Sequence, residues 1–174
     1  MHWKDRGIWV SCLLLATVGC DQATKIVARD ALANSGSHSY LGDLLRVELV
    51  QNPGAFLSMG ANLSSNSRFW IFNIAVTVLI AAIGVALYRS RKSGPLFSLA
   101  LALIFAGGVG NIIDRFMFGS VTDFLNIGIG NLRTGIFNVA DMAVSAGAVL
   151  AFILPWVSQD ALGTRPPESA RKVR

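Results

Sequence analysis

FWIFNIAVTVLIAAIGVALY, residues 69–88, contains one strongly polar residue, Asn73, and no charged residue. A helix of about 20 apolar residues crosses the hydrocarbon core of a bilayer, which is roughly 30 Å thick. Arg68 and Arg89 bound the stretch on either side, where a span would meet water. The stretch therefore predicts a membrane-spanning helix.

Three more apolar stretches have a similar length, at about residues 7–29, 95–117 and 136–157. The composition agrees with a membrane protein, because 53% of the 174 residues are hydrophobic and only 14% are charged. The four stretches together predict four spanning helices that form one bundle.

A small sheet is predicted from the segment after the first span. LRVELV, residues 45–50, alternates apolar with charged side chains, the period of two that a half-exposed strand shows. Pro53 and Gly54 then favour a turn. We expect an outer β region at about residues 40–60, and hence an all-α membrane protein: a four-transmembrane-helix bundle with a small outward-facing β-sheet.

The basic residues predict the orientation in the membrane. Lys and Arg gather in the amino-terminal segment, in the 89–92 turn and near the carboxyl terminus. By the positive-inside rule these segments are cytoplasmic, and the connections 30–67 and 118–135 face outward. We expect residues 1–160 to form a single membrane domain and residues 161–174 a flexible cytoplasmic tail.

Several other classes of protein and site are disfavoured. The net charge of +5 does not indicate nucleic-acid binding, since the basic residues lie in short clusters between apolar runs. Cys12 and Cys20 lie too far apart on one helix to form a disulfide. His2 and His38 have no Cys partners at the spacing of metal ligands. We expect no metal, no other cofactor and no nucleic-acid partner.

The first span has one alternative reading, as a removable export signal. Lys4 and Arg6 precede an apolar run that ends in TVGC, residues 17–20, as in a lipoprotein export signal. Such a signal usually has leucine where Thr17 stands, and three further apolar stretches follow. We favour a retained span.

The strongly polar residues of the predicted spans lie at one depth. With this orientation they occupy the outer ends of three spans and the connection after the third: Asp21, Lys25, Asn111, Asp114, Arg115, Asp123, Asn138 and Asp141. An acidic or basic side chain at the centre of a spanning helix costs about 2.5 to 3.5 kcal/mol on insertion scales, and it normally faces protein or a wet cavity. The shared depth therefore predicts a polar pocket that opens outward.

Two features of this layer favour a structural role. Asp21 and Lys25 are four residues apart on a helix, the spacing of an ion pair that stabilises the first span. Glycines in AGGVGN, residues 106–111 and including Gly108, indicate close helix packing that brings Asn111 near a neighbouring helix. Asp114 and the adjacent Arg115 point to different faces of the helix, so we do not expect them to form an ion pair with each other.

Two other polar residues keep two possible roles each. Arg115 either binds a substrate carbonyl or extends to the membrane interface. Asn138 lies three residues before Asp141, where it either orients that carboxylate or caps the helix.

Asp123 and Asp141 are the candidates for catalysis. A buried carboxylate needs compensation, for which Lys25, Arg115 and Arg133 are the available cations. Two carboxylates close together can instead share a proton, so that one acts as a general base and the other as an acid. Such a pair activates water against an amide, as in aspartic proteases. Ion coupling is the other role that intramembrane acids serve.

Five motifs in order resemble those of bacterial lipoprotein signal peptidase, also called signal peptidase II. They are DQATK (21–25), NPGAF (52–56), GGVGNIIDR (107–115), VTDF (121–124) and FNVAD (137–141), and they extend from the first predicted span to the fourth. The resemblance implies an intramembrane aspartic endopeptidase of the bacterial inner membrane, with its site near the outer face. The substrates implied are diacylglyceryl-modified prolipoproteins, which are cut just before the lipidated cysteine.

The resemblance also implies roles for individual residues. The family's catalytic aspartates fall on Asp123 and Asp141. Positions expected to bind substrate or orient the site are Asn52, Gly54, Asn111, Arg115, Asn138 and Ala140. Positions expected to support the structure are Asp21, Lys25, Gly108 and Asp114. The partners implied are prolipoproteins and membrane lipids, with the enzyme as a monomer and a mobile outer segment over the substrate.

Some features depart from the family or leave alternatives open. The residues beside FNVAD differ from those that family members commonly have there, at Leu132, Arg133 and Met142. The resemblance therefore does not predict the details of the pocket rim. A small transporter or proton-coupled channel is the competing class, although the inner half of every predicted span is apolar. A structural membrane subunit is the third possibility.

Overall fold

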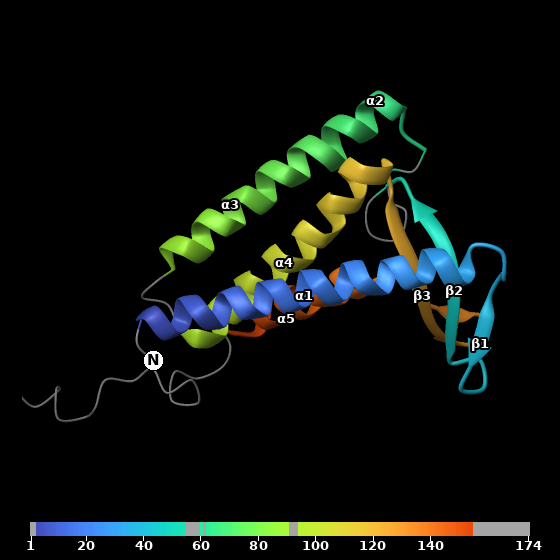
Figure 1. Cartoon of the computed structure of the whole chain (residues 1–174), viewed down its shortest axis with the longest axis horizontal. Coiled ribbons are helices and arrows are strands. Elements are labelled where there is room, and N and C mark those ends of the chain that lie inside the picture. Colours follow the sequence, from blue (N-terminus) through green and yellow to red (C-terminus); the bar gives the residue numbers. More distant parts are fainter. Residues whose placement is uncertain (1–2, 55–59, 61, 91–93, 155–174) are drawn as a thin grey trace, which may run out of the picture.

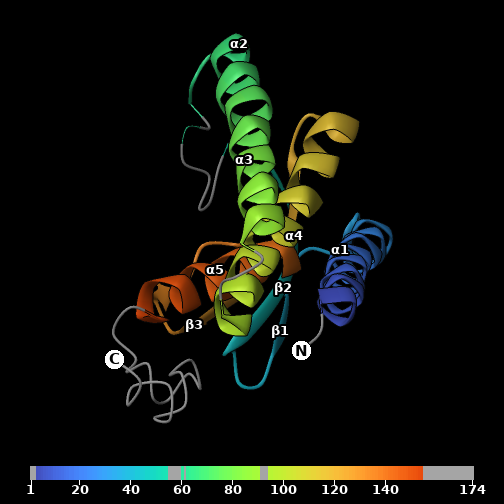
Figure 2. The ribbon, with the colours of Figure 1, turned by 90° about the vertical axis from the view of Figure 1, so that its left-hand side faces the viewer.

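The computed structural model describes residues 3–54, 60, 62–90 and 94–154, and shows a group of helices with a sheet at one end (Figure 1). The helical elements are α1 (Trp3–Leu32), α2 (Ser65–Arg68), the π-helical η2 (Phe69–Ala75), α3 (Val76–Arg89), α4 (Pro95–Phe118) and α5 (Val139–Ile153). Helix α4 packs against α1, α3 and α5, so it is the centre of the group (Figure 2).

Three of the predicted spans are confirmed as helices with the length and hydropathy to cross a membrane: Gly7–Leu32, Ser65–Arg89 and Pro95–Phe118. The predicted fourth span, 136–157, corresponds to α5, which is apolar but has only 15 residues. That is shorter than the roughly 20 residues of a full crossing. The end of the predicted span, like the predicted tail at 161–174, lies outside the described residues.

Local sequence explains where α4 begins and ends. Pro95 occupies the first turn, where its missing N–H is not needed by the helix. Gly119 ends the helix with a φ of 73°, and its N–H donates to the carbonyl oxygen of Arg115 at 3.0 Å. A side chain disfavours this left-handed conformation, which explains a glycine at this turn. The chain then reverses directly into a strand.

The sheet contains four antiparallel strands in the order β1 (His38–Tyr40), β2 (Leu45–Asn52), β3 (Val121–Ile129) and β4 (Leu132–Arg133). The strands run across the ends of the helices (Figure 1). The prediction of a β region at about 40–60 is confirmed for β2, whereas β1 begins before it and residues 55–59 lie outside the described residues. The prediction was also incomplete, because the second connection supplies the other two strands. A two-stranded hairpin is marginal in water, so β2 needs this further partner.

The register of β2 and β3 brings two site residues to one end of the sheet. Asn52 pairs with Val121 and Val50 with Asp123, after an irregularity between Val47 and Val50. The sequence interpretation of Asp123 as a loop residue was therefore wrong. Strand β3 is buried over its first four residues, so it lacks the polar–apolar alternation of a half-exposed strand.

Candidate active site

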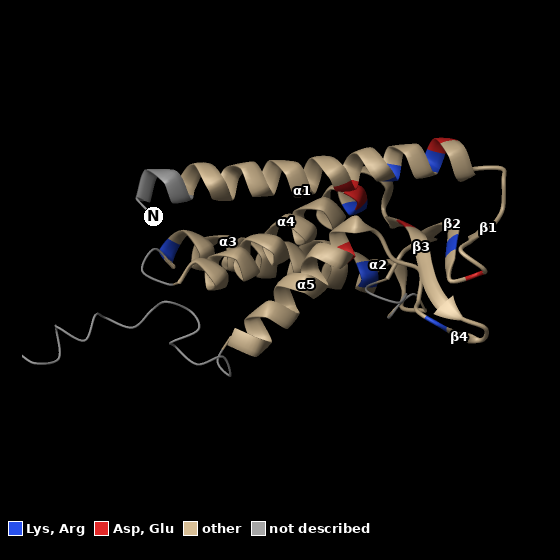
Figure 3. Ribbon diagram, turned by 90° about the horizontal axis from the view of Figure 1, so that it is seen from below, with Lys and Arg blue, Asp and Glu red and all other residues tan. Residues whose placement is uncertain are grey.

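Buried polar residues gather where α1, α4 and α5 meet β2 and β3. Figure 3 colours the acidic and basic positions along these elements. They include Asp21, Lys25, Asn52, Asp114, Arg115, Thr122, Asp123, Asn126 and Asn138. The polar layer predicted from the sequence is thus one cluster at the sheet end of the helices.

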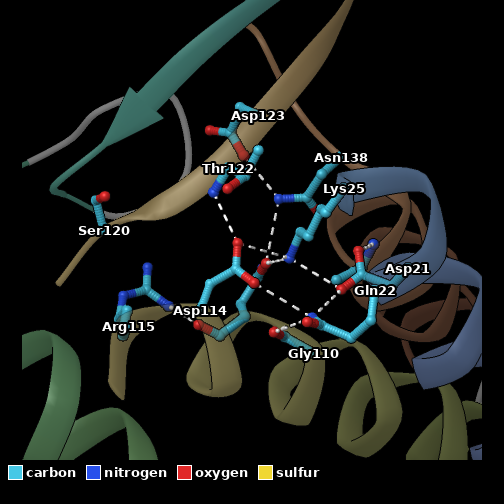
Figure 4. Close-up of polar contacts among 12 residues, drawn as sticks. Asp21, Gln22, Lys25, Gly110, Asp114, Arg115, Ser120, Thr122, Asp123 and Asn138 are labelled. Carbon is cyan, nitrogen blue, oxygen red and sulfur yellow. Dashed lines mark hydrogen bonds and ion pairs between the residues drawn. The ribbon is translucent and has the colours of Figure 1, made fainter. Parts of the chain in front are cut away.

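The base of the cluster is a buried group of three charges from α1 and α4. Lys25 Nζ lies 2.9 Å from Asp21 Oδ2 and 3.5 Å from Asp114 Oδ2 (Figure 4). All three residues have a relative exposure of 0%. Burying a charge is costly unless a partner compensates it. The predicted ion pair between Asp21 and Lys25 is confirmed, and Asp114 joins it.

The two carboxylates of this ion cluster also bind the backbone of two other elements. Asp21 Oδ1 accepts a hydrogen bond from Ala140 N at 2.8 Å, and Asp114 Oδ2 accepts one from Thr122 N at 2.8 Å. Each of these backbone groups directly precedes one of the two aspartates predicted to be catalytic. The ion cluster therefore determines where β3 and the start of α5 lie relative to each other.

Asp123 lies on β3 with a relative exposure of 2%. Its Oδ2 accepts a hydrogen bond from Asn52 Nδ2 at 2.8 Å, and its Oδ1 accepts one from Asn138 Nδ2 at 2.6 Å. Burial raises the pKa of Asp123 to about 6, and the nearby charge of Asp141 raises it too, against the lowering effect of the two amide donors. This carboxyl can therefore hold or release a proton near neutral pH.

Asp141 is half-buried in the first turn of α5. Its Oδ1 accepts a hydrogen bond from Asn111 Nδ2 at 2.8 Å, and its Oδ2 accepts one from Asn138 N at 3.2 Å. Asp141 N in turn donates to Asn138 Oδ1 at 2.9 Å, which completes a capping box. Asn138 therefore both caps the helix and orients the carboxylate.

The three asparagines have defined amide orientations, because the partner of each side-chain oxygen can only donate. Asn52 Oδ1 accepts from Gly54 N at 2.9 Å, and Asn111 Oδ1 accepts from Lys25 Nζ at 3.0 Å. Asn138 Oδ1 faces a backbone N–H in the same way. All three Nδ2 groups are therefore directed at the carboxylates, and each of the four carboxylate oxygens accepts one hydrogen bond.

Arg115 is 9% exposed and lies inside the protein. Its Nη2 donates to Gly54 O at 2.9 Å and its Nη1 to Asn111 O at 3.4 Å, while the guanidinium carbon lies 6.0 Å from the Phe72 ring centroid. Of the two roles considered, extension to the interface is not observed. Arg115 and Asp114 point apart, as expected for neighbours on a helix (Figure 4).

Arg133 does not compensate the two aspartates, and that suggestion from the sequence was wrong. It lies on β4 beside the far end of β3, where its Nε donates to Asn126 Oδ1 at 2.5 Å and its Nη1 lies 3.4 Å from Asp43 Oδ2. Hydrogen bonds from Arg46 and Ser39 hold the pKa of Asp43 well below its usual value. This outer group stabilises the ends of the sheet.

Gly107, Gly108 and Gly110 confirm the expectation of close packing. A Cβ at Gly107 would collide with the carbonyl oxygen of Ala140, and one at Gly108 would collide with Ile80. A Cβ at Gly110 would lie 2.5 Å from a carboxylate oxygen of Asp21. These glycines allow α4 to approach α1, α3 and α5 closely.

Three residues that contribute to the polar cluster were not predicted from the sequence. Gln22 Nε2 donates to Gly110 O at 3.1 Å, and Arg29 Nη1 donates to Thr122 Oγ1 at 2.9 Å. Gln22 and Arg29 lie three residues before and four residues after Lys25, a helical spacing that signals a shared face. Thr122 carries no such local signal, because its role depends on long-range contacts.

A cavity of about 340 Å³ lies apart from this cluster, between α1 and the sheet. Its lining includes Val27, Val47 and Phe124 and contains no ionisable side chain. The polar cluster, rather than this cavity, therefore has the groups needed for acid–base chemistry. Among the described residues, no three His, Cys, Asp or Glu side chains are grouped as metal ligands.

Comparison with known proteins agrees with these observations. Residues 13–157 match the protein family described as signal peptidase (SPase) II. A lipoprotein signal peptidase from Desulforapulum autotrophicum is 37% identical over 142 residues, 81% of this chain and 85% of the relative. One from Bifidobacterium adolescentis is 32% identical over 162 residues, 90% and 80% of the two chains. A solved bacterial membrane enzyme has a TM-score of 0.71 at 26% identity, covering 91% of this chain and 93% of that one.

Proposed function

The chain belongs to the signal peptidase II family, and on this premise we propose that it is an aspartic endopeptidase with Asp123 and Asp141 as its catalytic pair. Its substrates are prolipoproteins whose cysteine carries a diacylglyceryl group, and it cleaves the bond just before that cysteine. The relatives named lipoprotein signal peptidase support this substrate class.

The observation that carries the proposal is the hydrogen bonding of the two carboxylates. Asn138 contacts both of them, and every carboxylate oxygen accepts from a nitrogen donor. These donors stabilise the ionised form of a carboxylate, whereas burial and the charge of Asp141 raise the pKa of Asp123, so that Asp123 holds a proton more readily than an exposed aspartate. A shared proton gives the pair one base and one acid.

The reaction follows from this arrangement. The ionised carboxylate removes a proton from water as the water oxygen attacks the scissile carbonyl. The protonated carboxyl then donates its proton to the departing nitrogen, and the C–N bond breaks. The raised pKa of Asp123 suits a group that is protonated before attack. The two groups are coupled, however, so the pair titrates as a unit.

The remaining site residues orient this pair or the substrate. Asn52, Asn111 and Asn138 orient the carboxylates, and Asp21 and Asp114 hold the neighbouring backbone through Ala140 and Thr122. Arg115 donates to the Gly54 carbonyl oxygen, which holds the segment that directly follows Asn52 at the end of β2. Such preorganisation lowers the entropic cost of reaching the reactive geometry.

The proposed location is the bacterial cytoplasmic membrane, with both termini inside and the site near the outer face. Helix α5 is the proposed fourth span, and residues 1–160 are proposed to act as one domain in a monomer among membrane lipids. Arg89 is in the last turn of α3, and this end of α3 lies away from the sheet, which supports this orientation (Figure 1).

A test of the proposed function uses the purified full chain in lipid bilayers. We expect it to cleave a diacylglyceryl prolipoprotein and to leave the precursor without lipid uncut. Mass spectrometry should find the lipidated cysteine as the new amino terminus. Cleavage at another bond, or no cleavage of the lipidated precursor, would contradict the proposal.

A further inference from the structure

Arg29 lies in the last turn of α1 and contacts two other elements. Its guanidinium carbon is 4.6 Å from the centroid of the Phe118 ring at the end of α4, and its Nη1 donates to Thr122 Oγ1 on β3 at 2.9 Å. The side chain is 23% exposed, so the guanidinium is partly sheltered from water. One side chain thus joins α1, α4 and the strand that carries Asp123.

Thr122 is held both by its backbone and by its hydroxyl group. Its N–H donates to Asp114 Oδ2 at 2.8 Å, and its Oγ1 accepts from Arg29 and, at 3.4 Å, from Gln51 Nε2. The residue has a relative exposure of 0%. Contacts on both sides of one residue restrict the rotation as well as the position of the strand.

The chemistry of arginine suits this task. A guanidinium is planar and donates in fixed directions, and it stacks on aromatic faces. The contact with the Phe118 ring therefore helps to hold the guanidinium where it reaches Thr122. A lysine ammonium is a flexible point charge and would not transmit that direction.

We propose that Arg29 is a positioning residue for Asp123 and acts through Thr122; this rests on the proposed catalytic role of Asp123. Successive strand residues point to opposite faces, so a twist at Thr122 redirects the next side chain. A displacement of about 1 Å in a catalytic group can cost about a hundredfold in rate. Arg29 therefore contributes to turnover although it is not itself a catalytic residue.

The test compares the variants Arg29→Gln, Thr122→Val and Thr122→Ser, with Arg89→Gln as a matched control. Arg89 is exposed at the other end of the helices. We expect Arg29→Gln and Thr122→Val to lower kcat by about 10- to 100-fold with KM changed by less than about twofold. Thr122→Ser keeps the hydroxyl acceptor and should retain most of the kcat, as should Arg89→Gln.

A double variant separates positioning from general stabilisation. Because Arg29 acts through the Thr122 hydroxyl, Arg29→Gln should cause little further loss of kcat in the Thr122→Val background. A purely structural role would lower the melting temperature while the folded fraction kept its normal kcat. If Arg29→Gln does not fold, the Thr122→Val and Thr122→Ser pair decides the question.

Assaying Asp123→Asn in parallel distinguishes a failure of the Arg29 proposal from a failure of the proposed function. If Asp123→Asn is inactive but folded Thr122→Val keeps a kcat within about twofold of the starting protein, the positioning role of Arg29 is overturned. If Asp123→Asn keeps full activity, the proposed function itself fails.

Discussion

Asn138 hydrogen-bonds to both carboxylates, to Asp123 through its side chain and to Asp141 through its backbone N–H. Its Nδ2 donates to Asp123 Oδ1, and its backbone and side chain form the capping box with Asp141. The same Nδ2 lies 3.1 Å from Asn111 Oδ1. Asn138 therefore couples the start of α5 to the orientation of both acids.

Substitution of Asn138 can separate these two roles. Asn138→Ser keeps a good helix cap but loses the amide donor to Asp123. We expect its melting temperature to stay near that of the unmodified protein while kcat falls by about 10²-fold. Asn138→Ala should also lose the cap, at a cost of about 1 kcal/mol in the free energy of unfolding. Similar kcat values for Asn138→Ser and the unmodified protein would contradict this role.

The raised pKa of Asp123 predicts a pH dependence of stability. The folded state binds this proton more tightly than the unfolded chain, because the pKa rises from 3.8 to about 6 on folding. The raised pKa of Asp123 therefore stabilises the folded protein fully at a pH below the pKa of Asp123 in the unfolded chain. This stabilisation is lost as the pH rises through the pKa of Asp123 in the folded protein. Its full size is about 3 kcal/mol.

Unfolding measurements between pH 4 and 7 can check this prediction. The free energy of unfolding should fall more steeply with rising pH in the unmodified protein than in Asp123→Asn, which has no carboxyl at that position. Parallel pH profiles for the two proteins would show that Asp123 titrates normally in the folded state.

At the scale of elements, α4 needs small residues where it meets α1 and α5. Gly110→Ala would place a Cβ 2.5 Å from Asp21 Oδ2 and 3.3 Å from the Ala140 side chain. We expect a loss of about 1 to 3 kcal/mol in the free energy of unfolding. Gly19→Ala on α1 is the control, because a Cβ there meets nothing within 4 Å. Equal stabilities of the two variants would contradict the packing argument.

Elements with a local signal could be predicted from the sequence, and the others could not. The apolar stretches and the Asn138–Asp141 spacing are local, and they located the helices and the cap of α5. Strand β3 has no clear alternation because it is buried on both faces at its start. Its hairpin signal, Gly130-Asn131 between two apolar residues, was present but was overlooked.

At the scale of the whole molecule, the ion cluster joins α1 and α4 to the two elements that carry the aspartates. Lys25→Met would leave the buried Asp21 without a cation and Asp114 with only the more distant Arg29 Nη1, at a cost of about 3 to 5 kcal/mol in the free energy of unfolding. Arg46→Met breaks a partly exposed ion pair with Asp43 that water screens, so it should destabilise the protein much less than Lys25→Met. Chemical unfolding of both variants in the same lipid would check this, and equal losses would contradict it.

The candidate site could be predicted as a set of residues but not as a network. Shared depth and motif order identified Asp123, Asp141 and the asparagines. Arg29 and Thr122 contact each other although they are 93 positions apart in the chain. Such contacts depend on the tertiary fold, for which local spacing carries no information.

The central claim is that Asp123 and Asp141 act together on water. The most direct measurement is the kcat of Asp123→Asn and Asp141→Asn on a diacylglyceryl prolipoprotein, with folding checked by circular dichroism and exposed Asp30→Asn as the control. Asp123→Asn and Asp141→Asn should each lower kcat by about 10²- to 10⁴-fold, whereas Asp30→Asn should leave kcat nearly unchanged. A folded Asp123→Asn or Asp141→Asn variant with near-normal turnover would contradict the account.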